Sequence, residues 1–232
     1  MKTPEKTKVS SRNRVDEPVN PGSSRARRAP KPASKRYHHG NLRDALLLAA
    51  DAVLAARGVP GITLRDVAKV AGVSHAAPYH HFASLDDLLA AVAERAFITL
   101  GDAVERASAV ADTRERLLRI SEAYVNSARA HPARFRLMFG PLLARKRAYP
   151  AMQAASERAF GVLLAAACAH DKKNGPELAL CGWSLAHGLS NLIIDGAFTG
   201  LPMKAQNPDR LPRQLTLRLL GAKGAGAGKS GG

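Results

Sequence analysis

The chain has 232 residues, with 35 Lys and Arg against 19 Asp and Glu, which gives a formal net charge of +16 and an isoelectric point near 10.5. This charge suits a polyanionic partner. No stretch reaches the roughly 18 consecutive apolar residues of a membrane span, and no apolar segment of signal-peptide length lies near the N-terminus. We therefore expect a cytoplasmic protein that has no membrane partner.

Residues 1–36 hold eleven basic and three acidic residues, so half of the net charge lies in this segment. It contains five prolines and almost no large apolar residue. Burial of so little apolar surface cannot offset the conformational entropy that the segment would lose on ordering. We therefore predict a disordered basic tail. Two interpretations stay open: the tail keeps the protein in solution, or it follows phosphates along a nucleic acid.

Two helices are predicted next, each with a capping box. Asn41 and Asp44 precede an amphipathic pattern that ends at Gly58, and Thr63 and Asp66 precede a second pattern that ends at Gly72. A glycine in this position supplies the left-handed conformation that closes a helix. The spacing indicates two helices separated by a short connection.

A third helix can begin within three residues of Gly72, because Ser74 is a good N-cap. Pro78 and Phe82 then share the inward face, while His75, Ala76, Tyr79 and His80 point outward. A short helix with small and hydrogen-bonding side chains fits the major groove of DNA. We interpret it as a recognition helix within a helix-turn-helix domain of residues 37–99. The alternative is a helical hairpin that only builds a core.

Further helices are predicted over 85–106, with Ser84 and Asp87 as its capping box, and then over 113–130, 134–139, 149–170, 177–198 and 210–220. No segment alternates with the period of a strand, and the pairs Gly140-Pro141, Gly175-Pro176 and Leu201-Pro202 separate helical runs. We predict an all-α fold with a second helical domain over 100–220 and a flexible low-complexity end over 221–232.

Neither metal chemistry nor catalysis is expected. Cys168 and Cys181 lie thirteen residues apart, without the spacing of a zinc or redox motif, and are interpreted as reduced core residues. The histidine pairs at 38–39 and 80–81 cannot face one metal ion from a helix. No paired carboxylates, nucleophile elbow or phosphate loop appears, so we expect neither an enzyme nor a cofactor.

The residues resemble a known family. The runs YHHGNLRDALLLAADAVLAARG, ITLRDVAKVAGVSHAAPYHHF and SLDDLLAAV are similar to the DNA-binding domain of TetR-type bacterial transcriptional regulators, and Trp183, His187 and Gly188 resemble the signature of a Trp-His-Gly subgroup. The resemblance implies a homodimer that binds a palindromic operator in double-stranded DNA, associated with the bacterial nucleoid. It also implies that an unknown small-molecule effector controls repression.

The resemblance further implies which residues contact DNA. In this sequence they are Thr63, Arg65, Ser74, His75, Ala76, Ala77, Tyr79, His80 and His81. Family members often have Lys or Arg at the first position of the fourth helix, where this chain has Leu85. We therefore predict that the folded domain binds DNA with a weaker salt dependence than such relatives, unless the basic tail replaces the missing contact.

In the C-terminal half we expect an effector pocket lined by Phe135, Met138, Phe139, Trp183 and Leu189, with His187 as a polar group inside it. Taken alone, each of these side chains is more typical of an ordinary core than of a ligand contact. Dimerisation is expected on the last two long helices, where the apolar residues exceed what one subunit needs to cover: Leu189, Leu192, Ile193, Phe198, Leu215, Leu217, Leu219 and Leu220. An architectural DNA-binding protein without sequence preference is the alternative function, because the charge and the tail also suit it.

Overall fold

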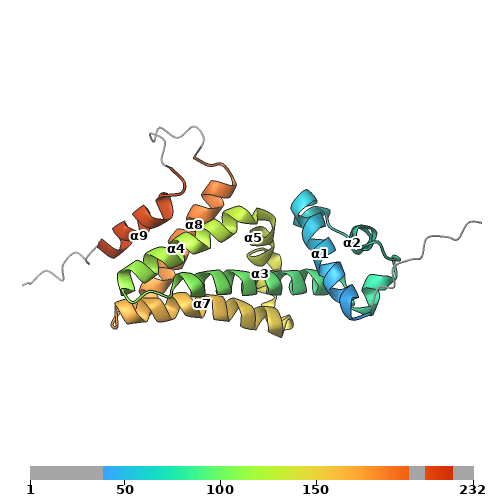
Figure 1. Cartoon of the computed structure of the whole chain (residues 1–232), viewed down its shortest axis with the longest axis horizontal. Coiled ribbons are helices and arrows are strands. Elements are labelled where there is room, and N and C mark those ends of the chain that lie inside the picture. The colour runs from blue at the N-terminus through green and yellow to red at the C-terminus, as the bar shows by residue number, and fades with distance from the viewer. Residues whose placement is uncertain (1–38, 199–206, 222–232) are drawn as a thin grey trace, which may run out of the picture. The chain divides into compact units, whose positions relative to one another are not determined.

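The computed structural model describes residues 39–198 and 207–221, and every regular element in these ranges is helical (Figure 1). The predictions for residues 1–36 and 222–232 lie outside the described residues. Within the described part, the all-α prediction is confirmed. The helices are α1 (His39–Arg57), α2 (Leu64–Ala71), α3 (Leu85–Ala107), α4 (Thr113–Ala130), α5 (Pro132–Met138), α6 (Pro141–Ala144), α7 (Pro150–His170), α8 (Gly175–Ile194) and α9 (Leu211–Gly221).

The predicted ends of α2 and the start of α3 are confirmed by hydrogen bonds. The Thr63 hydroxyl accepts a bond from the backbone N–H of Asp66 at 3.1 Å and donates to its carboxylate at 2.6 Å. Ser84 and Asp87 repeat this arrangement at 3.1 and 2.8 Å. Gly72 closes α2 with a φ of 70°, the left-handed conformation that favours glycine.

Other predicted helix ends are wrong. The first helix begins at His39, so Asn41 lies inside α1 instead of capping it. Prolines start α5, α6 and α8, in the last two cases at pairs that the sequence pattern marks as breaks, because a residue in the first turn has no intrahelical acceptor for the N–H that proline lacks. Helix α8 ends at Ile194, four residues early, since Gly196 takes a φ of 66° and its N–H bonds the Ile193 carbonyl.

Helix α3 connects the two halves of the described structure. It packs against α1 at one end and along α7 and α4 over the rest of its length (Figure 1). Its buried residues belong to one continuous hydrophobic core that also includes Leu46 of α1 and Val125 of α4. Movement of α3 is therefore coupled to both halves.

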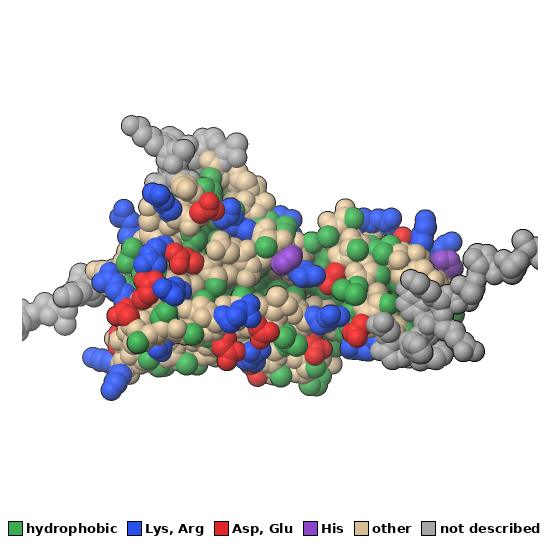
Figure 2. All heavy atoms as spheres, in the orientation of Figure 1, with side chains coloured by type: hydrophobic (Ala, Val, Ile, Leu, Met, Phe, Trp, Pro, Cys, Tyr) green, Lys and Arg blue, Asp and Glu red, His purple; other side chains and the backbone are tan. Residues whose placement is uncertain are grey.

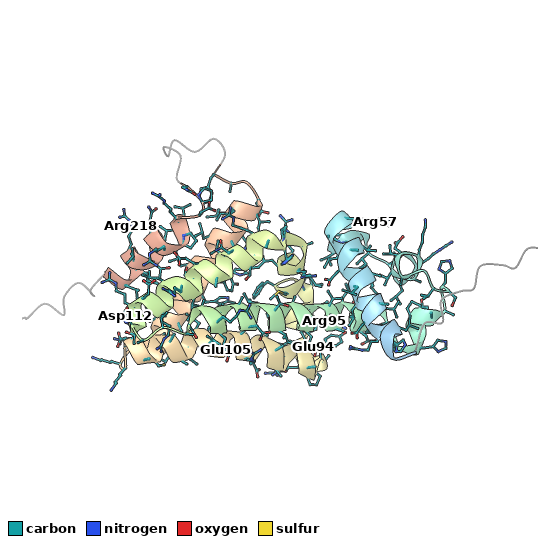
Figure 3. The ribbon with its side chains drawn as sticks, viewed as in Figure 1. Arg57, Glu94, Arg95, Glu105, Asp112 and Arg218 are labelled. Carbon is teal, nitrogen blue, oxygen red and sulfur yellow. The ribbon has the colours of Figure 1, made fainter. Side chains whose placement is uncertain are left out.

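Ion pairs fix α1 to its neighbours. Arg57, at the end of α1 (Figure 3), pairs with Asp66 of α2 at 2.9 Å. The Arg134 guanidinium donates two hydrogen bonds, of 2.9 and 2.8 Å, to the Asp51 carboxylate and so attaches α5 to α1. The hydrogen bond from Thr63, followed by that from Arg57, lowers the pKa of Asp66. The carboxylate thus stays ionised where α1 and α2 meet.

No helix in residues 39–198 and 207–221 is both long enough and apolar enough to cross a membrane.

Candidate functional site

The element predicted as a recognition helix is shorter than expected. Residues Ala77–His80 form a single 3₁₀ turn, preceded by a turn at residues 75–76. Ser74 does not cap it with its side chain. Instead, its carbonyl accepts a bond from the Ala77 N–H at 3.0 Å. The reason is Pro78, which has no N–H to donate to that carbonyl and thereby prevents a regular α-helix from beginning at Ser74.

The predicted division of this segment into two faces is confirmed. Pro78 is fully buried and Phe82 is only 4% exposed. The Arg43 guanidinium of α1 lies over the Phe82 ring, 5.4 Å from its centroid. His75, Ala76, Tyr79, His80 and His81 are all exposed, Tyr79 to 61%. The inward residues hold the turn, while the outward ones are free to meet a partner.

Neighbouring residues extend this exposed surface. Thr63, Arg65 and Ser74 are exposed, whereas Ala77 is half-buried. Lys69 comes four residues after Arg65 on α2, so the two cations share one face. Figure 2 shows Lys, Arg and His side chains on the surface over α2, at the right of the view. Imidazole, phenol and cationic groups together provide hydrogen-bond donors suited to phosphates and base edges.

The start of α3 adds little positive charge to this surface. Leu85 is half-buried, and Asp86 and Asp87 occupy the first turn of the helix. Asp86 is paired with Arg145 at 2.7 Å, and Asp87 is held by Ser84. Two carboxylates already complement the helix dipole there, so the backbone amides at this helix start are a poor anion site. Between residues 39 and 84, four basic residues oppose three acidic ones, so the charge excess of the chain lies elsewhere.

A second candidate site is a cavity of about 360 Å³ inside the C-terminal half. It is lined by residues of α3, α4, α7, α8 and α9, together with Phe139 and Lys146. Most of the lining is aliphatic or aromatic. The main contributors are Phe97, Leu100, Val104, Leu117, Ile120, Phe139, Phe160, Leu163, Leu164, Leu178, Trp183, Leu219 and Leu220. Polar side chains in the lining include Ser121, Tyr124 and Thr216.

Tyr124 is the centre of a polar cluster on this wall. Its hydroxyl accepts a hydrogen bond from Trp183 Nε1 at 3.3 Å and lies 3.0 Å from His187 Nδ1. The His187 ring packs against the aromatic rings of Phe135 and Phe139, with centroid distances of 5.1 and 4.7 Å. Burial raises the pKa of Tyr124 and lowers that of His187, so both side chains are neutral at pH 7.

The structure revises the predicted effector pocket. Phe139 and Trp183 line the large cavity, whereas Phe135 and Met138 line a separate cavity of about 30 Å³. His187 and Leu189 line neither, because His187 is behind Tyr124 and Leu189 is buried in the core. Sequence reasoning missed Tyr124. The only signal was a phenol on the apolar stripe of its helix, and a buried hydroxyl needs a hydrogen-bond partner.

The exposed apolar surface of α8 differs from the predicted dimer surface. Leu189 is buried, and Leu219 and Leu220 line the cavity. Leu192, which belongs to the predicted surface, is exposed, and together with Leu180, Ser184 and Gly188 it forms a row of exposed positions spaced four residues apart along α8. Cys181 is exposed beside them and Cys168 is half-buried, so the expectation that both cysteines are core residues is wrong.

No group of three or more His, Cys, Asp or Glu side chains in the described ranges is placed to hold a metal ion.

Both halves of the chain match models of a known protein family. Residues 46–92 match the family model for bacterial regulatory proteins of the tetR family, and residues 117–219 match that for the tetracyclin repressor-like C-terminal domain. The two matches together span more than half of the chain. The chain belongs to the TetR family. It is a DNA-binding transcription regulator, and the Trp-His-Gly subgroup stays a prediction.

Solved TetR-like structures share this fold. The chain is 30% identical to a protein of unknown function from Rhodococcus sp. RHA1, with a TM-score of 0.68 over 80% of this chain and 97% of that one. It is 24% identical to the TetR family transcriptional regulator PfmR from Thermus thermophilus, with a TM-score of 0.55 over 75% and 96%. A tetR family regulatory protein from Rhodococcus RHA1 is 20% identical, with a TM-score of 0.58 over 81% and 96%. No curated protein matches the chain.

Proposed function

We infer that this TetR-family protein is a ligand-responsive transcriptional repressor that binds a palindromic operator as a homodimer. The observation that carries this proposal is the two-sided turn at residues 75–81, whose inner side is anchored by Pro78 and Phe82 while its outer side is exposed. The turn lies within the segment that matches the TetR DNA-binding domain. In this role its outer side chains read base edges in the major groove.

The surrounding residues position the turn on the duplex. Thr63, Arg65 and Ser74 contact phosphates or nearby bases. His75, Ala76, Ala77, Tyr79, His80 and His81 meet the groove, and the small side chains of the two alanines allow close approach. In this proposal, the contacts with the DNA phosphates fix how the domain is oriented on the duplex. The side chains of the turn determine which base sequence it binds.

The homodimer forms, in this proposal, through the exposed row of α8. Leu180 and Leu192 are 54% and 47% exposed, and Ser184 and Gly188 between them are small. A Cβ at Gly188 meets no atom within 4 Å, so a partner helix has room to approach closely. Two subunits related by a twofold axis present two turns to half-sites about 34 to 36 Å apart, one helical repeat of DNA.

The effector binds in the 360 Å³ cavity and acts on DNA binding through α5. Phe139, which comes directly after α5, lines the cavity, and Arg134 on α5 holds Asp51 of α1 with two hydrogen bonds. A ligand that displaces Phe139 therefore shifts a helix that is attached to the DNA-binding domain. Through Phe139 and α5, the ligand can therefore favour either the DNA-binding or the non-binding arrangement of the regulator.

DNase footprinting on genomic fragments, with and without cell extract, tests the function. A repressor protects one palindromic site at concentrations that leave other fragments uncovered. The second candidate, an architectural protein, is favoured by the net charge of +16 and its concentration in residues 1–36. Uniform coating of all fragments at comparable affinity would support that candidate and contradict the first.

A further inference from the structure

The lining of the large cavity restricts the kind of molecule that it can hold. Its volume of about 360 Å³ falls in the range of small-molecule sites. Phe97, Phe139 and Trp183 present aromatic surface, and the aliphatic side chains of α3, α4, α7 and α8 cover most of the rest. A molecule inside the cavity meets carbon on most sides, so binding is driven by its own apolar surface.

The charged groups of the lining favour a neutral molecule. They are Lys146 and Glu157, one of each sign. Glu157 is exposed, which places it where the cavity meets solvent, and Lys146 is only half-buried. An ionised group that enters the apolar interior would find no buried counter-ion and would lose its hydration.

Hydrogen-bonding capacity inside the cavity is limited. The Thr216 hydroxyl donates to the Ser121 hydroxyl at 3.0 Å, so the Thr216 proton is used and this buried pair has only the Ser121 proton left to donate. A tyrosine hydroxyl has one proton and two lone pairs. Trp183 occupies one lone pair of Tyr124, and His187 occupies either the proton or the second lone pair. One position on the Tyr124 hydroxyl therefore remains for a ligand.

We propose that this cavity binds an uncharged, largely apolar small molecule with one hydroxyl or carbonyl group, which hydrogen-bonds to the Tyr124 hydroxyl. His187 acts as a positioning residue, because its tautomer decides whether Tyr124 donates to the ligand or accepts from it. The inference rests on the proposed function only in identifying this molecule as the effector of the regulator. Binding itself is independent of DNA.

Fluorescence of Trp183 reports on the cavity directly, since this residue lines it and is the one tryptophan of the chain. The full-length protein is titrated with para-butylbenzyl alcohol and with two analogues of the same framework, the carboxylate para-butylbenzoate and the ammonium ion of para-butylbenzylamine. Butylbenzene serves as the probe without a polar group. We expect saturable binding of the alcohol and dissociation constants at least about tenfold higher for both ions.

Two variants locate the site and the contact. Tyr124→Phe keeps the ring and removes the hydroxyl. It should therefore weaken the affinity for the alcohol by about three- to tenfold and leave the affinity for butylbenzene unchanged. Gly161 of α7 lines the cavity, and a Cβ there meets no atom within 4 Å. Gly161→Leu should therefore fold, fill the cavity and abolish binding of both probes. Gly161→Ala is the matched control and should retain most of the affinity.

Three results would overturn the inference: equal affinity for an ion and the alcohol, a Tyr124→Phe effect as large on butylbenzene as on the alcohol, or no saturable change in Trp183 emission with any probe up to its solubility limit. Unchanged binding to Gly161→Leu would place the site elsewhere and would overturn it as well. None of these results affects the DNase footprint. A wrong ligand class can therefore be distinguished from a wrong assignment of the repressor function.

Discussion

Replacing Leu192 of α8 with aspartate should separate the proposed homodimer into monomers. Full burial of a leucine side chain contributes about 2 kcal/mol. Leu180 and Leu192 are 54% and 47% exposed in the single chain, so burying the remainder of each contributes about 1 kcal/mol. The twofold axis doubles the loss at residue 192 to about 2 kcal/mol and brings two carboxylates together, which raises the dimer dissociation constant at least about thirtyfold.

Sedimentation velocity over a concentration series measures this change. Leu48→Asp is the matched control, because Leu48 is a 60% exposed leucine within a helix, on α1. Both variants should keep the helical circular dichroism of the wild type, since neither side chain belongs to the core. The Leu192 variant should also lose operator affinity, because a monomer contacts only one half-site.

An unchanged dissociation constant for Leu192→Asp, or an equal loss in Leu48→Asp, would refute the reasoning. In either case the exposed row of α8 would not be the dimer surface.

The DNA-facing turn, the basic tail and an ion pair of α4 each give a further prediction. Tyr79→Ala should lower operator affinity about 5- to 150-fold in gel-shift titrations with a melting temperature close to wild type, whereas Phe82→Ala should cost about 3 to 5 kcal/mol in chemical unfolding; a Tyr79 variant with full affinity would contradict the assignment. Deletion of residues 1–36 should reduce the slope of log affinity against log salt without moving the footprint, and identical slopes would remove the tail from DNA binding. Hydrogen bonds from Arg213, then Arg119, lower the pKa of Glu115 from 4.5 to about 2. The stability that this carboxylate gives is therefore present above about pH 4.5 and lost as the pH falls toward 2, so the advantage of wild type over Glu115→Gln in urea unfolding should shrink over that range; a constant difference would contradict the pairing.

Local sequence signals predicted the helices whose ends are set by local chemistry. The Thr63 and Ser84 caps and the glycine closure at residue 72 depend on contacts within four residues, and α4 has the predicted bounds of Thr113–Ala130. Proline was the main source of error. It forbids continuation of a helix but is favoured in the first turn, so the same residue can end one helix or start the next.

The DNA-facing turn could be predicted as a pattern of faces but not as a conformation. The spacing of Pro78 and Phe82 predicted the buried side correctly, because both a 3₁₀ turn and an α-helix bring residues three or four apart together. The cavity could not be predicted in detail. Its polar centre joins Tyr124 to residues 59 and 63 positions away, and only the packing of α4 against α8 brings them together.

Chemical modification of histidines with diethyl pyrocarbonate, with and without operator DNA, tests the central claim most directly. His75, His80 and His81 are exposed on the turn, and His131 is an exposed histidine outside it, between α4 and α5. If the outer side of the turn enters the groove, operator DNA should protect the three histidines of the turn and leave His131 as reactive as before. Equal modification of the turn in free and operator-bound protein would contradict the account.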